Sequence, residues 1–234
     1  MKREVIIACD FQEPDACFRF LDRFTDRKPF VKIGMEVFYG NGPQLVREIK
    51  QRGHKIILDL KLHDIPNTVH QSMRKLAELD VDMVNVHAAG TIRMMEAARS
   101  ALDEKGSHAI LLAVTQLTST SEDVMRRELL IDRSIEETVR HYAANAKAAG
   151  CSGVVCSPLE VQAVHAHCGA GFVTVTPGIR FADDDKGDQR RVTTPAKARE
   201  LGSDFIVVGR SITAAPDPVA AYQRAVREFE GENA

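Results

Sequence analysis

Short, almost wholly apolar runs alternate with longer amphipathic segments along the entire chain. The runs are rich in Val and Ile, which is typical of strands that are covered on both faces in a parallel sheet. The strands that this pattern predicts are Val5–Asp10, Phe30–Met35, Lys55–Lys61, Met83–Ala88, Ala109–Thr115, Gly153–Ser157, Phe172–Pro177 and Phe205–Arg210.

Helical patterns occupy most of the segments between these runs. Thr194 followed by Pro195 is typical of a helix N-terminus, and Gly150, Gly169 and Gly202 stand where C-terminal caps are expected. The predicted helices are Pro43–Arg52, Thr68–Leu79, Arg93–Leu102, Ser134–Ala149, Leu159–His167, Pro195–Leu201 and Pro218–Glu230, and the long gap from Gln116 to Arg133 has room for a loop and an extra helix.

Strands that alternate with helices in this way predict an α/β protein, specifically a (β/α)8 TIM barrel. The length of 234 residues is close to the roughly 250 residues typical of such a barrel. No linker or low-complexity stretch interrupts the alternation, so residues 1–234 are expected to form a single domain. An open, doubly wound sheet is the alternative fold.

Composition and charge narrow the range of partners and compartments. The formal net charge is −2, which gives no basic surface for nucleic acid or for an anionic membrane. The longest apolar runs fall short of the ~18 residues of a membrane span, and the apolar run after the N-terminal Met is too short for a signal peptide. A cytoplasmic location is expected. The five cysteines contain no CxxC pair, so we expect reduced, mostly buried thiols.

Charged residues gather at the C-terminal ends of the predicted strands, where the active sites of (β/α)8 barrels lie. Asp59 and Lys61 are two positions apart on one strand and should face the same side of it. Asp10 ends the first predicted strand and Lys32 lies on the second, so both should converge with them, and Asp64 is a candidate to join them. The alternative is a buried ion pair that only organises this end of the barrel.

This arrangement limits the chemistry that Lys61 can perform. Adjacent carboxylates stabilise the ammonium form of a lysine, whereas a Schiff-base lysine must be a neutral amine. We therefore interpret Lys61 as a proton donor and a source of positive charge. A proton donor beside buried carboxylates suits a reaction that generates a carbanion, such as a decarboxylation.

A second group of residues has the character of a phosphate site. Gly178 and Gly209 permit close backbone approach, and they follow the last two strands, where barrel phosphate sites commonly lie. Arg210 can hold a phosphate with two hydrogen bonds, and a helix that begins near Ser211 could add N–H donors. The polar segment 181–193 is predicted to be a loop that closes over a ligand; a solvated surface loop is the alternative.

The histidines have no spacing that suggests a metal site. His87, at the end of the fourth strand, is expected to have a structural role. His63 is expected to be a loop or interface residue rather than a catalyst.

The run Asp59-Leu60-Lys61-Leu62-His63-Asp64-Ile65-Pro66-Asn67-Thr68 resembles the signature of the orotidine 5'-phosphate decarboxylase family. The resemblance extends over nearly the whole chain, including Ala8–Asp10, Val31–Gly34, Val86–Gly90, Thr176–Arg180 and the Gly209–Arg210 pair. It implies decarboxylation of a small-molecule substrate, orotidine 5'-phosphate, to uridine 5'-phosphate and CO2 in de novo pyrimidine biosynthesis. It also implies a homodimer that uses neither a metal ion nor an organic cofactor.

The resemblance further implies a role for each matched residue. Lys61 would deliver a proton to C6 of the pyrimidine, and Asp59 would lie beside the substrate carboxylate. Asp64 and Thr68 would reach the site of the partner subunit. Lys32 and Asp10 would bind the ribose hydroxyls and complete the charge network, and Thr118 would contact the pyrimidine. The phosphate would be bound by Arg180, Gln189, Gly209 and Arg210.

Two other functions remain open. The related keto-gulonate phosphate decarboxylases and hexulose phosphate synthases share the Asp-x-Lys-x-x-Asp run, but they bind magnesium with a glutamate near the position of Lys32, where a lysine repels a dication. A non-catalytic binder of nucleotide phosphates would keep Gly209 and Arg210, but it would not need Lys61 between two acids.

Overall fold

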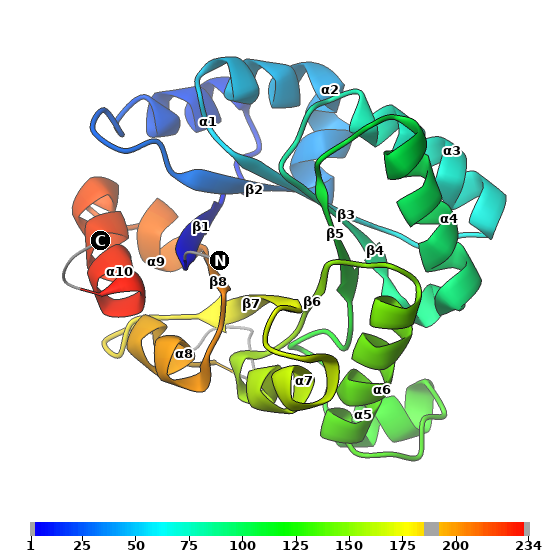
Figure 1. The fold of residues 1–234 in the computed structure, drawn as a ribbon. Coiled ribbons are helices and arrows are strands. Elements are labelled where there is room, and N and C mark those ends of the chain that lie inside the picture. Colours follow the sequence, from blue (N-terminus) through cyan, green and yellow to red (C-terminus); the bar gives the residue numbers. More distant parts are fainter. Residues whose placement is uncertain (1–2, 185–191, 232–234) are drawn as a thin grey trace.

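Eight parallel strands close into a barrel in their order along the chain (Figure 1). The computed structural model describes residues 3–184 and 192–231. The strands are β1 (Glu4–Ala8), β2 (Phe30–Gly34), β3 (Ile56–Leu62), β4 (Met83–His87), β5 (Ile110–Val114), β6 (Gly153–Val155), β7 (Val173–Ile179) and β8 (Phe205–Val208). β1 pairs with β8 from Glu4↔Phe205 to Ile7↔Val208. This pairing closes the sheet, so the predicted (β/α)8 barrel is confirmed and the open-sheet alternative is wrong.

Helices surround the barrel on its outside (Figure 1). They are α1 (Pro14–Leu21), α2 (Met35–Gln51), α3 (Pro66–Ala77), α4 (Thr91–Glu104), α5 (Glu122–Glu128), α6 (Ile135–Ala148), α7 (Val161–Cys168), α8 (Pro195–Leu201), α9 (Arg210–Thr213) and α10 (Pro218–Glu230), with short 3-10 turns η1 (Ala88–Gly90) and η2 (Pro158–Glu160). α8 and α10 have the predicted bounds. α5 is the extra helix expected in the long gap.

The predicted helix boundaries rest on caps that the structure contains. The Thr194 hydroxyl accepts a hydrogen bond from the Lys197 N–H at the start of α8, and Gly202 ends that helix with a φ of 93°. At the start of α6, Ser134 and Glu137 bond each other's backbone N–H groups. Each of these bonds satisfies a backbone group that the helix end would otherwise leave without a partner.

Two helices differ most from the sequence prediction, while α3, α4, α6 and α7 have ends shifted by one or two residues. α1 was not predicted, yet it covers the barrel with an apolar face that buries Cys17, Phe20 and Leu21. α2 begins at Met35 instead of at Pro43, and Gly42 interrupts it with φ 70° and ψ −171°. The Gly-Pro pair is a typical helix start, but here the chain is helical on both sides of it.

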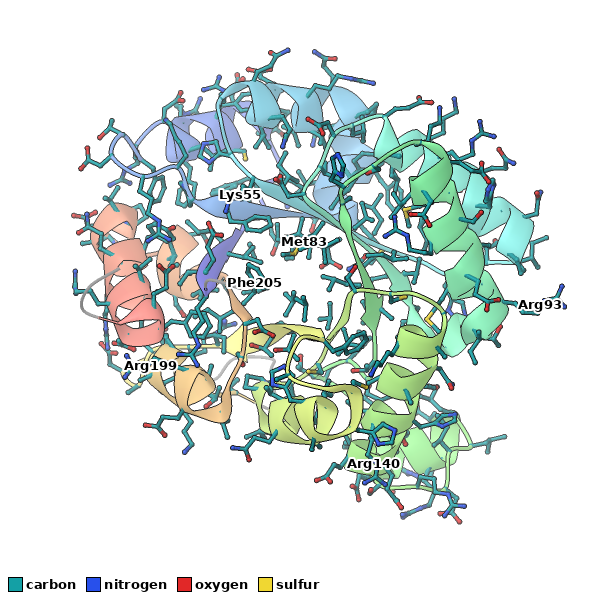
Figure 2. The ribbon with its side chains drawn as sticks, viewed as in Figure 1. Lys55, Met83, Arg93, Arg140, Arg199 and Phe205 are labelled. Carbon is teal, nitrogen blue, oxygen red and sulfur yellow. The ribbon has the colours of Figure 1, made fainter. Side chains whose placement is uncertain are left out.

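The core has two layers because strand side chains alternate between the two faces of the barrel wall. Inward-facing residues fill the barrel, whereas the alternate residues pack against the surrounding helices. In Figure 2, Met83 and Phe205 lie near the centre of the ring of strands, while Arg93, Arg140 and Arg199 project outwards from α4, α6 and α8. The inward cluster consists of Ile6, Ala8, Phe30, Ile57, Met83, Leu112, Val173, Val175, Phe205 and Val207.

All five cysteines are buried and free, as expected. Within the described part of the chain, no helix has both the length and the apolar character that crossing a membrane requires.

Candidate active site

The polar residues of the site form the next layer above the barrel core. Lys32, Asp59 and Asn85 each follow an inward-facing core residue by two positions, namely Phe30, Ile57 and Met83. Because side chains alternate along a strand, these three also point towards the barrel axis, closer to the C-terminal ends of their strands. Asp10 stands in the same relation to Ala8, although β1 ends at Ala8 rather than at Asp10 as predicted.

The four predicted charges meet in a chain that alternates in sign. Lys61 Nζ lies 2.7 Å from Asp59 Oδ1. Lys32 Nζ lies 3.6 Å from Asp59 Oδ2 and 3.2 Å from Asp10 Oδ1. The side chain of Asp59 is only 14% exposed, so it needs these cations to remain ionised there. We call Asp10, Lys32, Asp59 and Lys61 the acid–lysine cluster, and the expected convergence is confirmed.

The charge of Asp59 results from two opposed effects. Burial raises the pKa of its carboxyl group, but the ammonium groups of Lys32 and Lys61 lower it. Hydrogen bonds from Lys61 and Asn85 lower it further, and the net pKa is below the usual value. Asp59 is therefore an ionised carboxylate that attracts the ammonium groups of both Lys32 and Lys61.

The backbone of Lys61 departs from regular strand geometry. Its φ is 49°, in the left-handed region that residues other than glycine rarely adopt. The pairing of β3 with β4 slips between Leu58 and Leu62, so the stretch that carries Asp59 and Lys61 is irregular. The two side chains meet as predicted, but the regular two-residue alternation of a strand is not the whole reason.

Asn85 is a member of this site that the sequence analysis missed. Its Nδ2 donates to Asp59 Oδ1 at 2.6 Å, and its Oδ1 accepts from the Lys61 N–H at 2.7 Å. It is 1% exposed. The available signal was a lone amide in the apolar run of β4, two positions after a core residue.

Two cavities adjoin at the acid–lysine cluster. One, of about 260 Å³, is lined by Asp59, Lys61, Asn85 and Thr118 together with apolar residues. The other, of about 560 Å³, contains most of the predicted phosphate residues. They share Lys32, Pro177 and Val207. A ligand with a planar ring at one end and an anionic group at the other would fit this pair of cavities.

The second cavity gathers Gly178, Arg180, Gly209 and Arg210. Gly178 has a φ of 80° at the point where β7 slips its register against β8, and this conformation suits glycine. Arg210 begins α9, instead of ending β8 as predicted. Gln189 and most of the predicted closing loop lie outside the described residues.

The Asp64 and Thr68 side chains do not join the cluster in the described part of the chain. Both residues are exposed, and Asp64 Oδ1 accepts a hydrogen bond from the adjacent Ile65 N–H at 2.7 Å. Asp64, a candidate to join the cluster, therefore does not contact it within its own chain.

His63 and His87 stack face to face next to the cluster, with ring centroids 5.3 Å apart. Burial lowers the pKa of His87, and the charges of His63 and Lys61 lower it further. His87 Nδ1 accepts a hydrogen bond from the Ala89 N–H at 3.2 Å, which fits the structural role expected for it. Among the residues described, no group of three His, Cys, Asp or Glu side chains is arranged to hold a metal ion.

Active sites of (β/α)8-barrel enzymes lie at the C-terminal ends of the strands, which is where the acid–lysine cluster lies, so fold and site together define an enzyme of this class. Comparison with known families narrows the class. The model described as "Orotidine 5'-phosphate decarboxylase / HUMPS family" matches residues 3–225. The chain belongs to this family.

Individual relatives are similar over their full lengths. The chain is 54% identical to an orotidine 5'-phosphate decarboxylase from a Geobacillus species over 236 residues, which covers 99% of each chain. It is 54% identical to that of Bacillus cytotoxicus over 235 residues, again covering 99% of each. The crystal structure of orotidine 5'-phosphate decarboxylase from Lactobacillus acidophilus superposes with a TM-score of 0.87 at 43% identity, covering 97% of this chain and 99% of that one.

Proposed function

We propose that this chain decarboxylates orotidine 5'-phosphate to uridine 5'-phosphate and CO2, a step of de novo pyrimidine biosynthesis. The observation that carries the proposal is the Lys61 ammonium group 2.7 Å from the half-buried Asp59 carboxylate, in the wall of a cavity. The full-length relatives that bear the name of this activity support the same conclusion.

The chemistry follows from where the charges lie. When the bond between C6 and the carboxylate breaks, CO2 leaves and the electron pair stays on C6. Lys61 supplies positive charge where that pair develops and then donates a proton to C6, which gives uridine 5'-phosphate. An ammonium group already held in place by Asp59 needs little reorganisation during the reaction. Each tenfold gain in rate corresponds to about 1.4 kcal/mol of transition-state stabilisation.

The other members of the cluster orient this step. We propose that Asp59 lies beside the substrate carboxylate, where like charges repel in the ground state and the repulsion ends as CO2 leaves. Lys32 and Asp10 would bind the ribose hydroxyls, since they line the cavity that continues from the pyrimidine end. Thr118 would contact the pyrimidine edge.

The phosphate would bind at the far end of the second cavity. Arg180, Gly209 and Arg210 line it, and Gln189 is proposed as a fourth contact from the segment 181–193. These contacts are remote from the bond that breaks. Their binding energy can hold the ring against Lys61.

The position of Lys32 favours this reaction over magnesium-dependent chemistry on a sugar phosphate. Its ammonium group stands between Asp10 and Asp59, where it neutralises the carboxylates that a divalent ion would need.

Purified protein treated with a chelator should remove the orotate absorbance of orotidine 5'-phosphate. Absence of turnover under these conditions, with the fold verified by circular dichroism, would overturn the proposal.

We further propose that the enzyme is a homodimer in which Asp64 and Thr68 reach the site of the partner subunit. Both residues are exposed in the single chain, and the intervening Ile65 is 66% exposed, so all three side chains are accessible to a partner subunit. Mixing inactive Lys61→Ala and Asp64→Ala proteins should restore part of the activity, because a hybrid dimer holds one site free of both substitutions. Verified subunit exchange without recovery would refute the shared site.

We also propose a cytoplasmic location. Five free, buried thiols suit a reducing compartment. Fractionation of the source cells should place the enzyme with cytoplasmic markers, and recovery in a secreted or membrane fraction would contradict this.

A further inference from the structure

We propose that Asn85 is a positioning residue for the decarboxylation, because its amide holds the Asp59 carboxylate and the Lys61 backbone in a fixed relation. This inference rests on the proposed function. The orientation of the amide follows from chemistry alone. The backbone N–H of Lys61 can only donate, so it must face Asn85 Oδ1, and ionised Asp59 can only accept, so it must face Nδ2.

A buried amide such as that of Asn85 destabilises the barrel unless its polar atoms form hydrogen bonds. Asn85 is 1% exposed, between Val84 and Val86 in β4. On the next strand, the residue paired in register with Asn85 is Leu112, an apolar residue of the inward cluster. Packing at this level of the barrel is therefore satisfied by an apolar side chain, and Asn85 has a different purpose.

One purpose is to support the strained backbone of Lys61. Where β3 slips against β4, Asn85 supplies the acceptor for the Lys61 N–H through its side chain, at 2.7 Å. Lys61 is held there with a φ of 49°, a conformation that costs about 1–3 kcal/mol and persists only when surrounding contacts maintain it. The Asn85 contact is one that maintains it.

The second purpose is to set the rotation of the Asp59 carboxylate. Asn85 Nδ2 and Lys61 Nζ both donate to Oδ1 of Asp59, at 2.6 and 2.7 Å. Oδ2 is left to face Lys32 Nζ at 3.6 Å. Asn85 thus fixes the rotation of the Asp59 carboxylate, so that Oδ1 faces Lys61 and Oδ2 faces Lys32. Its second hydrogen bond ties this orientation to the backbone of Lys61.

Replacement of the amide by an apolar group of similar size tests the proposal. Asn85→Leu should lower kcat by about 10–100-fold, as expected for lost hydrogen bonds to a charged group. Binding of uridine 5'-phosphate, measured by calorimetry, should weaken far less, because Asn85 is not among the residues of the phosphate cavity. Val84→Ala is the matched control: it removes buried volume from the other face of β4 and should leave kcat nearly unchanged.

A second readout does not depend on turnover. The hydrogen bond from Asn85 lowers the pKa of Asp59, so the pKa of this carboxyl should rise in Asn85→Leu when it is titrated by carbon-13 NMR. Should Asn85→Leu fail to fold, Asn85→Ser, which can bond only one of the two partners well, should give an intermediate loss of kcat and an intermediate rise of the pKa.

The outcomes separate this inference from the proposed function. A wild-type protein that fails to decarboxylate orotidine 5'-phosphate refutes the function, and the Asp59 titration then decides alone whether Asn85 holds the carboxylate. An active wild type together with a folded Asn85→Leu variant of unchanged kcat, or of unchanged Asp59 pKa, overturns the positioning role.

Discussion

Asp59→Asn removes the one negative charge that two lysine ammonium groups share. The substitution keeps the shape of the side chain and an oxygen that can still accept from Asn85. It leaves the Lys61 and Lys32 ammonium groups, at 2.7 and 3.6 Å from the Asp59 oxygens, without the anion between them. The variant therefore isolates the effect of charge from that of packing.

The expected loss of stability in Asp59→Asn follows from the distances between the charges and from the exposed fractions of the lysine side chains. Two unit charges about 4 Å apart interact by about 4 kcal/mol at an effective dielectric constant of 20, and breaking a fully buried pair costs about 3–5 kcal/mol. Lys32 and Lys61 are 16% and 26% exposed, so water screens part of this. We expect Asp59→Asn to lower the free energy of unfolding by about 2 kcal/mol and to lower kcat by at least about 100-fold.

The assay is urea unfolding followed by far-ultraviolet circular dichroism, because the chain has no Trp to serve as a fluorescent probe. Protein concentration must be equal for both proteins, since dimer formation would add to the measured stability. A variant with wild-type stability and wild-type kcat would refute the reasoning about the cluster.

The lowered pKa of Asp59 also predicts how this stability difference varies with pH. A carboxyl whose folded-state pKa lies below its unfolded value contributes stability that is fully present above the unfolded pKa of about 4. That contribution is lost as the pH falls through the folded-state pKa. The advantage of the wild type over Asp59→Asn should therefore be constant between about pH 6 and 8 and shrink below about pH 4. A stability difference between wild type and Asp59→Asn that grows on acidification would contradict a lowered pKa of Asp59.

Three further substitutions test other parts of the account. A methyl group at Gly34 would lie 3.1 Å from Lys32 Nζ, so Gly34→Ala should lower kcat/KM by up to about tenfold with an almost unchanged melting temperature; a wild-type kcat/KM would argue against the assigned place of Lys32. A methyl group at Gly153 would collide with the carbonyl oxygen of Val173, so Gly153→Ala should cost about 1–3 kcal/mol in urea unfolding, and unchanged stability would mean that β6 and β7 separate easily. Arg210→Ala should reduce kcat/KM by about 10–100-fold and weaken inhibition by inorganic phosphate; unaltered phosphate inhibition would place the anion elsewhere.

The barrel and the main charges of the site could be predicted from the sequence because they depend on alternation along strands. Inward-facing core residues alternate with helix-facing ones, and the same alternation places Lys32 and Asp59 above the core. The strand positions were correct, with ends shifted by a residue or two. Helix α1 was missed because its short apolar face follows a polar, proline-containing stretch.

The parts that could not be predicted depend on contacts between segments that are distant in sequence. The positive φ of Lys61 follows from a register slip between β3 and β4, which periodicity within one strand does not reveal. The role of Asn85 becomes visible only when its two partners on β3 are known. Asp64 accepts a hydrogen bond from the adjacent Ile65 N–H in the single chain, and the place proposed for it in the site requires a second subunit.

The central claim is that the Lys61 ammonium group stabilises and protonates the carbanion formed at C6. Its most direct test is the steady-state decarboxylation of orotidine 5'-phosphate by the wild type and by Lys61→Ala, with chelator present and circular dichroism verifying both folds. The account predicts turnover by the wild type and a loss of kcat/KM of at least about 1000-fold in the variant. A folded Lys61→Ala protein that retains near-wild-type kcat/KM would contradict it.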